Sequence, residues 1–333
     1  MVGIQLISAR IGAFSGHGLA TNIGRHYPRW LLILIVVMLL VANTINIAAD
    51  LVAMGDAVAL IVGGPQHVYA LLLGLISLAL QIWIPYERYV AVLKWLTLSL
   101  LAYVGTAFAI HINWAEVLSR TVLPHIRLDH DYVTMIVAIF GTTISPYLFF
   151  WQASQEVEEQ RRAPREEALK RRPEDVAEGV ARIRFDTCLG MGVSNFVAFF
   201  IMLTAAITLG EHGVTDITSS TQAASALKPV AGSFNWSNSL DHPPARSVKF
   251  YGIIGVATLL GAALALSPVN TIEALFWSAV INGVAAVPVM VLMMLLASNR
   301  EVMGKYTIGP TTKVIGWCAT FAMGAAVLGL AIG

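Results

Sequence analysis

Eight apolar runs divide this sequence, and they constrain its fold more than any other feature. A helix needs about 20 apolar residues to cross the hydrocarbon core of a bilayer, and most of the runs approach or exceed that length. Charged residues make up 12% of the chain, about half the share in a soluble domain, so few polar groups are available to cover the apolar surface in water. The predicted spans are 30–62, 68–84, 90–110, 132–153, 188–209, 252–266, 274–297 and 314–332.

These runs predict an all-α polytopic membrane protein with one transmembrane domain over residues 1–333. Residues 2–20 have the pattern of a further, partial helix that is too short, and too rich in Gly and Ser, to cross alone. The formal net charge of +1 lacks the basic surplus of a chain that binds nucleic acid. The expected surroundings are therefore the lipid bilayer, and the sequence points to no particular protein partner.

The stretch 154–186 is the most charged part of the chain, with eight Lys or Arg residues and nine acidic residues. Lys and Arg accumulate in loops on the cytoplasmic side of a membrane. We therefore predict a solvated, helical cytoplasmic loop in a multi-pass protein of the cytoplasmic (inner) membrane. A regulatory or partner-binding role for the charge run is the alternative.

The positive charges also test the number of spans. With residues 1–29 and 154–186 inside, strict alternation places the basic loop 300–313 outside and the turn 267–273, which has no Lys or Arg, inside. That arrangement is opposite to the usual bias, in which the loops rich in Lys and Arg lie on the cytoplasmic side. One more crossing between residues 210 and 252 would restore the bias, yet no apolar run of the needed length lies there. The pattern indicates that a span is absent where a related protein would have one; the alternative is that this interval stays outside and the bias is violated.

The fourth run contains GTTISPYLFFWQ, residues 141–152. Pro146 has no backbone N–H and clashes with the preceding turn, and a broken helix is tolerated at membrane depth only where protein or a water-filled cavity covers the freed carbonyls. Together with the hydroxyls of Thr142 and Ser145, these carbonyls would form an oxygen-rich site suited to a cation. A plain proline kink packed against a neighbouring helix is the alternative.

A polar stripe follows the first span, where Asn43, Asn46 and Asp50 share one helix face. An ionised Asp at bilayer depth costs on the order of 2.5–3.5 kcal/mol, so Asp50 is expected to face a cavity, a partner or a proton path. The alternative is a polar clamp between helices, with Arg10 as the candidate partner.

The sequence does not support an enzyme, because it shows no nucleophile–base pair and no zinc motif. Cys188 and Cys318 both lie in apolar stretches, which suits neither a disulfide framework nor a Cys-based metal site. No resident cofactor is expected.

Five segments resemble the Nramp family of divalent-metal transporters, and more closely its Nramp-related, magnesium-transporting branch. They are QLISARIGAFSGHGLA, NTINIAADLVAMGDA, GTTISPYLFFWQASQEVEE, RFDTCLGMGVSNFVAFF and ALFWSAVINGVAAVPVMVLMMLLASNREVMG, and they cover most of the chain in the family's order. The resemblance implies a LeuT-like fold of two inverted five-helix repeats. It also implies a substrate site at mid-membrane, between the broken first and sixth helices.

The resemblance carries over to individual residues at the break of the sixth helix. Typical family members read Ala-x-x-Met-Pro-His there, and the matching positions are Thr142, Ser145, Pro146 and Tyr147. A hydroxyl thus replaces the soft methionine sulfur, and hard oxygen ligands suit Mg²⁺, which keeps much of its water shell.

Two further positions match family residues linked to proton movement. A histidine that follows the break matches Gln152, and an acidic residue of the third helix matches Asp50. In the family, the acidic residue that matches Asp50 has a second acidic residue as its partner. The partner's position holds Ala53 in this chain, so the resemblance does not extend to proton coupling.

The resemblance also implies that two helices are missing. The family's first helix, with its Asp-Pro-Gly/Ser metal-binding turn, has no counterpart, and the chain is expected to open partway through the second helix. The eighth helix is missing between ALKPVAG and SLDHPPARSVKFYG, in the interval where the charge pattern requires a crossing. The expected LeuT-like fold is therefore incomplete.

The function implied is transport of a divalent cation of the Mg²⁺ or Mn²⁺ class by alternating access, with the metal as cargo. Thr142, through its carbonyl, and Ser145 are expected to bind the metal beside the break, whereas Asp50 is expected to serve a polar pathway. One alternative is a truncated remnant that inserts but does not transport. Another LeuT-like permease, such as an amino-acid carrier, ranks last.

Overall fold

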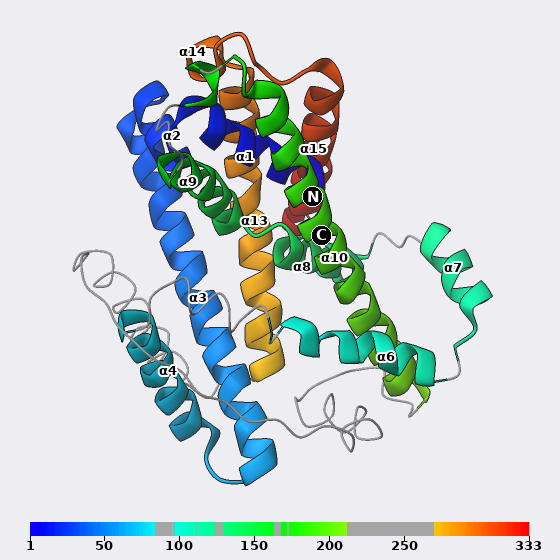
Figure 1. Cartoon of the computed structure of the whole chain (residues 1–333). Coiled ribbons are helices and arrows are strands. Elements are labelled where there is room, and N and C mark those ends of the chain that lie inside the picture. Colours follow the sequence, from blue (N-terminus) through cyan, green and yellow to red (C-terminus); the bar gives the residue numbers. More distant parts are fainter. Residues whose placement is uncertain are drawn as a thin grey trace. The chain divides into compact units, whose positions relative to one another are not determined.

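The structure is a computed structural model, and the residues it describes form helices and turns, with no strand among them (Figure 1). The prediction of an all-α chain is therefore confirmed. The predicted span 252–266, the first part of 90–110 and most of the interval from 210 to 252 lie outside the described residues. The described residues are 1–83, 95, 97–110, 112–123, 129–162, 168–171, 173–211 and 270–332.

The longer helices follow the apolar runs, and Gly16, Gly63 and Pro146 mark three of the helix boundaries. The bounds of the helices are α1 Val2–Ser15, α2 Leu19–His26, α3 Arg29–Val62, α4 Gln66–Trp83, α6 Leu101–Ala109, α7 Trp114–Val122, α8 His130–Thr143, α9 Pro146–Arg162, the 3₁₀ turn η1 Leu169–Arg171, α10 Val176–Glu211, α13 Thr271–Ser298, α14 Arg300–Met303 and α15 Pro310–Ile332.

Within the described residues, five stretches are long and apolar enough to cross a membrane. Each overlaps one of the predicted spans, and α8 and α9 together make up the second of them. The predicted span 68–84 overlaps α4, which has 18 residues. The total number of crossings stays a prediction. The five stretches are Arg29–Val62, His130–Gln160, Val176–Ile207, Thr271–Ser298 and Pro310–Ala331.

The chain divides into two compact units, and helices α3, α10 and α13 contribute to both. The first unit comprises Met1–Asn43, Arg127–Gly192 and Trp277–Gly333, and the second comprises Thr44–Ile126 and Val193–Phe276. The broken helix α8–α9 belongs to the first unit.

Helix α1 is the centre of the first unit. It packs against α9, α14 and α15, and large side chains on several of its faces, including Ile4, Ile7 and Phe14, are buried. Three methionines of α13, Met290, Met293 and Met294, fill the same core, where their flexible side chains suit irregular gaps. The partial helix predicted over residues 2–20 is thus a short, buried helix that stops at Ser15 and is followed by α2.

The charged stretch 154–186 is less uniformly solvated than its composition predicts. Helix α9 continues through its first part to Arg162, and α10 begins at Val176. Glu156 and Gln160 are buried among the helices of the first unit. Composition alone does not reveal that this part of the stretch turns one face toward α1.

In the second unit, the C-terminal half of α3 packs against α4 through Leu51, Val52 and Ala70. A separate cluster of aromatic rings joins α10 to the region of α6 and α7. In it, Phe200 lies within 6.4 Å, between ring centroids, of both Phe108 and Trp114.

Candidate functional site

The helix break lies between α8 and α9. Helical structure is interrupted at Ile144 and Ser145, and Ile144 adopts φ −117° and ψ 52°, away from helical values. In a continuous helix the carbonyl of Thr142 would accept a hydrogen bond from the N–H of residue 146, but Pro146 has none. The break therefore frees backbone oxygen atoms at the end of α8.

Ser145 caps these oxygen atoms from within the chain. Its side chain is buried, and its Oγ donates to the carbonyl of Gly141 at 2.9 Å, with the carbonyl of Thr142 at 3.3 Å. A hydroxyl carries one hydrogen and two lone pairs. Since the hydrogen is directed at the end of α8, the oxygen lone pairs remain available to another partner.

The neighbouring residues of the motif differ in how they use their polar groups. Thr142 and Tyr147 are both exposed at the surface of the described chain. Thr143, in contrast, donates its hydroxyl back to the carbonyl of Ile139 at 2.8 Å. The structure thus brings Thr142, Ser145 and Tyr147 together beside the proline, and their role as a metal site stays a prediction.

Close packing against α13 fixes the position of the break. Gly141 lies directly against α13: a Cβ atom there would be 2.6 Å from the backbone nitrogen of Gly283 and nearer still to the Ala279 carbonyl oxygen. The approach is mutual, because a Cβ on Gly283 would lie 2.8 Å from the carbonyl of Val137. Two glycines therefore allow the backbones of α8 and α13 to touch just before the break.

Asn282, on α13 beside this contact, is a polar residue that sequence reasoning missed. Its side chain is buried, and its Oδ1 has no hydrogen-bond partner among the described residues. A buried amide oxygen normally finds a partner, so this atom is suited to accept a hydrogen bond from a bound water molecule or to bind a cation. The signal in the sequence was a carboxamide in the otherwise apolar stretch 279–297.

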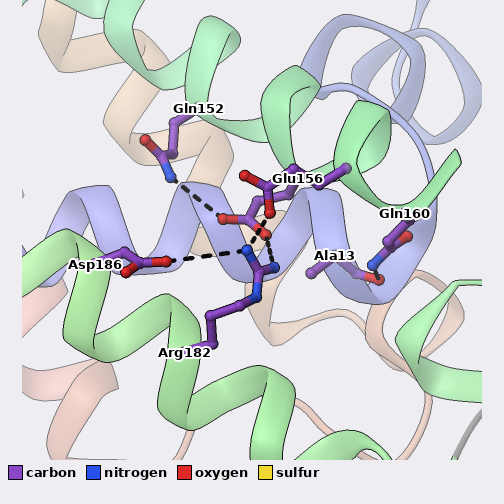
Figure 2. A network of polar contacts seen from close by, with 7 residues as sticks. Ala13, Gln152, Glu156, Gln160, Arg182 and Asp186 are labelled. Carbon is purple, nitrogen blue, oxygen red and sulfur yellow. Dashed lines mark hydrogen bonds and ion pairs between the residues drawn. The ribbon is translucent and has the colours of Figure 1, made fainter. Parts of the chain in front are cut away.

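Gln152, predicted for a polar or proton pathway, lies on α9 in a chain of side-chain contacts between helices. Its Oε1 accepts a hydrogen bond from Gln5 of α1 at 3.3 Å, and its Nε2 donates to Glu156 at 3.4 Å. Figure 2 shows the continuation of this network, in which Arg182 of α10 donates to Glu156 at 2.8 Å. Arg182 also pairs with Glu159.

The same network attaches α1 to α9 along its length. Ser8 donates its hydroxyl to the carbonyl of Phe149. Gln160 donates to the carbonyl of Ala13 at 2.7 Å, and both residues appear in Figure 2. The side chain of Glu156 is 6% exposed and that of Arg182 is 41% exposed. The ion pair is therefore partly desolvated, and removal of one partner would leave the buried carboxylate uncompensated.

The polar stripe predicted on α3 lies on a continuous helix. Asn43 and Asn46 are half-buried, and Asp50 is exposed. Asn46 and Asp50 belong to the second compact unit, whereas the helix break belongs to the first. The guanidinium of Arg10, the candidate partner, donates to the carbonyl of Tyr306 at 3.4 Å and lies over the ring of Phe14.

Among the described residues, no group of three or more His, Cys, Asp and Glu side chains is arranged to hold a metal ion. Hydroxyl, amide and carbonyl oxygen atoms are other protein groups that can bind a metal ion. The break in α8–α9 offers such atoms, and these ligands suit hard cations.

The surface and the helix break together define a class of protein. Large apolar side chains of α3, such as Ile33 at 61% and Val37 at 51% exposure, are uncovered along a helix long enough to span a bilayer. In water such an extended apolar surface would lead to aggregation, whereas lipid accommodates it. The chain is a multi-pass helical membrane protein, and its interrupted helix is a feature of transporter folds.

Comparison with known families makes the assignment specific. The sequence pattern of the Nramp family, described as natural resistance-associated macrophage protein-like, matches residues 1–240 and 231–332. This chain belongs to the Nramp family, which is a family of divalent-metal transporters. The resemblance to the Nramp family is thereby confirmed, whereas the magnesium-transporting branch and the two missing helices stay predictions. The two matched pieces overlap at residues 231–240.

Solved structures of similar fold include those of a manganese transporter from Eremococcus coleocola. A mutant of that protein superposes with a TM-score of 0.61 and 14% sequence identity, covering 98% of this chain and 76% of the other. Its complex with an aromatic bis-isothiourea substituted compound gives a TM-score of 0.62 with the same identity and coverage. The LeuT-like transporter fold is therefore confirmed. Comparison with curated proteins finds no match.

Proposed function

We propose that this chain carries a divalent cation, Mg²⁺ or Mn²⁺, across the cytoplasmic membrane by alternating access. The observation that carries the proposal is the break between α8 and α9, where Ser145 donates its hydrogen to the Gly141 carbonyl and keeps its lone pairs available. Membership in the Nramp family supports cation transport, and a solved relative of similar fold is a manganese transporter. The metal is the cargo, and no resident cofactor is part of the proposal.

The proposed ligands are all oxygen atoms of the first compact unit. They are the Thr142 carbonyl, which Pro146 deprives of its helical donor, the Ser145 hydroxyl and the Oδ1 atom of Asn282. Mg²⁺ and Mn²⁺ both accept oxygen ligands, and Mg²⁺ retains several water molecules when it binds to proteins. A site with few protein oxygen atoms therefore suits a partly hydrated ion.

Asn43, Asn46, Asp50 and Gln152 are proposed to form polar pathways rather than the metal site itself. The partly exposed stripe on α3 would allow water to reach Asp50, and a charged residue at this depth is typical of an ion pathway. Proton coupling is not part of the proposal.

Uptake of ⁵⁴Mn²⁺, and of Mg²⁺ reported by a trapped fluorescent indicator, into proteoliposomes tests the function. The unmodified chain should take up at least one ion, and Ser145→Ala and Asn282→Ala should each reduce uptake by about tenfold or more, because each removes a ligand worth at least about 1.4 kcal/mol. Thr143→Val is the matched control, since the hydroxyl of Thr143 bonds back to its own helix. It should retain uptake.

Two results would contradict the proposal. Absence of uptake of both ions by the unmodified, correctly inserted chain would favour a non-transporting membrane protein of this family. Uptake that is unchanged in Ser145→Ala and Asn282→Ala would exclude the helix break as the metal site while leaving transport itself in place.

A further inference from the structure

A pocket of about 420 Å³ lies where α1 ends and α2 begins, away from the helix break. Its walls come from these two helices and from α9, η1 and α14, all within the first compact unit. The volume is that of a small-molecule site. The proposed transport function does not use this pocket.

The turn that forms the pocket is fixed in shape. Gly16 ends α1 in the left-handed conformation, with φ 71° and ψ 17°, which glycine adopts without steric cost. A side chain there would also meet Ala168, because a Cβ atom would lie 2.9 Å from the Ala168 Cβ. Asn22 is buried and donates to the Ser15 hydroxyl at 2.8 Å and to the His17 carbonyl at 2.9 Å. The wall of the pocket is thus preformed.

Positive charge dominates the lining. Among the described residues that line the pocket, Arg25, Lys170 and Arg171 contribute three cationic side chains, against one carboxylate from Glu301. The Glu301 carboxylate lies 4.0 Å from the ring of His26. Within the described part of the chain, Arg25 and Arg171 form no ion pair. Cations gathered without matching acids repel one another and attract an anion.

Lys170 is held at the pocket by its own hydrogen bond. Its ammonium donates to the carbonyl of Val302 at 3.0 Å. Burial, and then the neighbouring charge of Arg171, lower the pKa of Lys170 below its ordinary value. An anion in the pocket would offset the repulsion between Lys170 and Arg171, so this arrangement of charges favours such a ligand.

The pocket lies close in sequence to the start of a membrane-spanning helix. After α2, the chain passes through Tyr27 and Pro28 into α3, whose second residue, Trp30, is 64% exposed. Tyr and Trp side chains are enriched at the level of the lipid headgroups. The amphipathic helix α2 buries Leu19 and Ile23 and leaves Arg25 exposed, which suits a helix at the membrane surface.

We propose that this pocket binds a phosphate group, carried either by an anionic lipid headgroup of the adjacent leaflet or by a soluble phosphate compound. Arginine presents a planar fork of donors that matches phosphate oxygen atoms, and Arg25 and Arg171 supply two such forks at one cavity. Basic pockets beside membrane helices on the cytoplasmic side are suited to anionic headgroups. Binding would join α2 and η1 through a single ligand.

The test uses the full chain and two double variants of equal net charge. Arg25→Gln with Arg171→Gln removes the two forks from the pocket, whereas Arg29→Gln with Arg300→Gln removes two exposed arginines that do not line it. Thermal stability and lipid retention, the latter by native mass spectrometry, are measured in phosphatidylcholine nanodiscs with and without phosphatidylglycerol. A parallel measurement in neutral detergent compares inorganic phosphate with chloride at the same ionic strength.

We expect the pocket variant to bind the phosphate group about tenfold or more weakly, as loss of charge-assisted hydrogen bonds implies, while the control variant resembles the unmodified protein. Stabilisation by phosphatidylglycerol alone would identify the lipid as the source, and stabilisation by inorganic phosphate would identify a soluble compound. Equal loss in both variants would indicate diffuse surface charge and overturn the proposal. Absence of any effect of both anions on the unmodified chain would also overturn it. Arg25→Lys with Arg171→Lys should restore part of the binding if the pocket variant remains folded.

Discussion

Adding one methyl group at Gly141 tests the contact between α8 and α13 that positions the helix break. A Cβ atom there would lie 2.6 Å from the Gly283 nitrogen, whereas ordinary van der Waals contact begins at 3.4 Å, so the two helices must separate by at least 0.8 Å. The obstacle is backbone, which cannot rotate away as a side chain can. We therefore expect a cost near the upper end of overpacking, about 3 kcal/mol.

Helix propensity acts in the opposite direction, because Ala is favoured over Gly by about 1 kcal/mol within a helix. Gly141→Ala should thus lose about 2 kcal/mol of unfolding free energy. Gly190 of α10 is the matched control, since no described atom lies within 4 Å of a Cβ placed there. Gly190→Ala should gain about 1 kcal/mol, which makes the expected difference between the two variants about 3 kcal/mol.

The assay is unfolding in mixed micelles by titration with dodecyl sulfate, followed by tryptophan fluorescence. Gly141→Ala should also reduce metal uptake, because Thr142 follows directly on the displaced residue. If Gly141→Ala proves as stable as Gly190→Ala, then α8 and α13 do not approach as closely as the structure has them. Packing of Gly141 against α13 would then not be what holds the helix break in place.

The ion pair and the basic pocket allow two further predictions. Arg182→Gln leaves the carboxylate of Glu156 buried without its partner, and because the Arg182 side chain is 41% exposed, we expect a loss of about 1–2 kcal/mol of unfolding free energy. The control Arg120→Gln breaks an exposed ion pair and should lose less than about 0.5 kcal/mol. Equal losses for the two variants in the same titration would contradict the prediction. Because the pKa of Lys170 is lowered in the folded protein, the unfolded chain binds more protons than the folded chain at a pH just below about 10.4, and stability should rise with pH there. Thermal unfolding of Lys170→Met should lack that rise. An identical slope of stability against pH in both proteins would exclude the effect.

Local sequence was sufficient to predict the fold class and the interruption of the fourth span. The interruption follows from chemistry within one turn, because Pro146 lacks an N–H and Ser145 can bond the carbonyls that precede it. The family, too, could be recognised because its motifs are contiguous stretches. Predictions that depend on one segment at a time are those in which sequence reasoning is strongest.

Tertiary contacts set the limit of sequence reasoning. The burial of Glu156 depends on α1 and α10, which are far from it in the sequence. From the sequence alone, the acidic run that contains Glu156 resembles a helix end exposed to water. The approach of Gly141 to Gly283 joins residues more than a hundred positions apart, and an isolated glycine in an apolar run does not reveal its neighbour. Asn282 was overlooked for the same reason, since its significance lies in the absence of a partner among the described residues.

The hydrogen bond from Ser145 to the Gly141 carbonyl has a consequence for selectivity by sign of charge. The hydroxyl of a serine in water rotates freely and can turn either its hydrogen or its oxygen lone pairs toward an approaching ion. Here the end of α8 already accepts the hydrogen, so the side of the buried hydroxyl that faces away from α8 presents only oxygen lone pairs. An approaching anion would meet repulsion unless that bond were broken, whereas a cation would find the dipole already oriented and would need no reorganisation of the side chain.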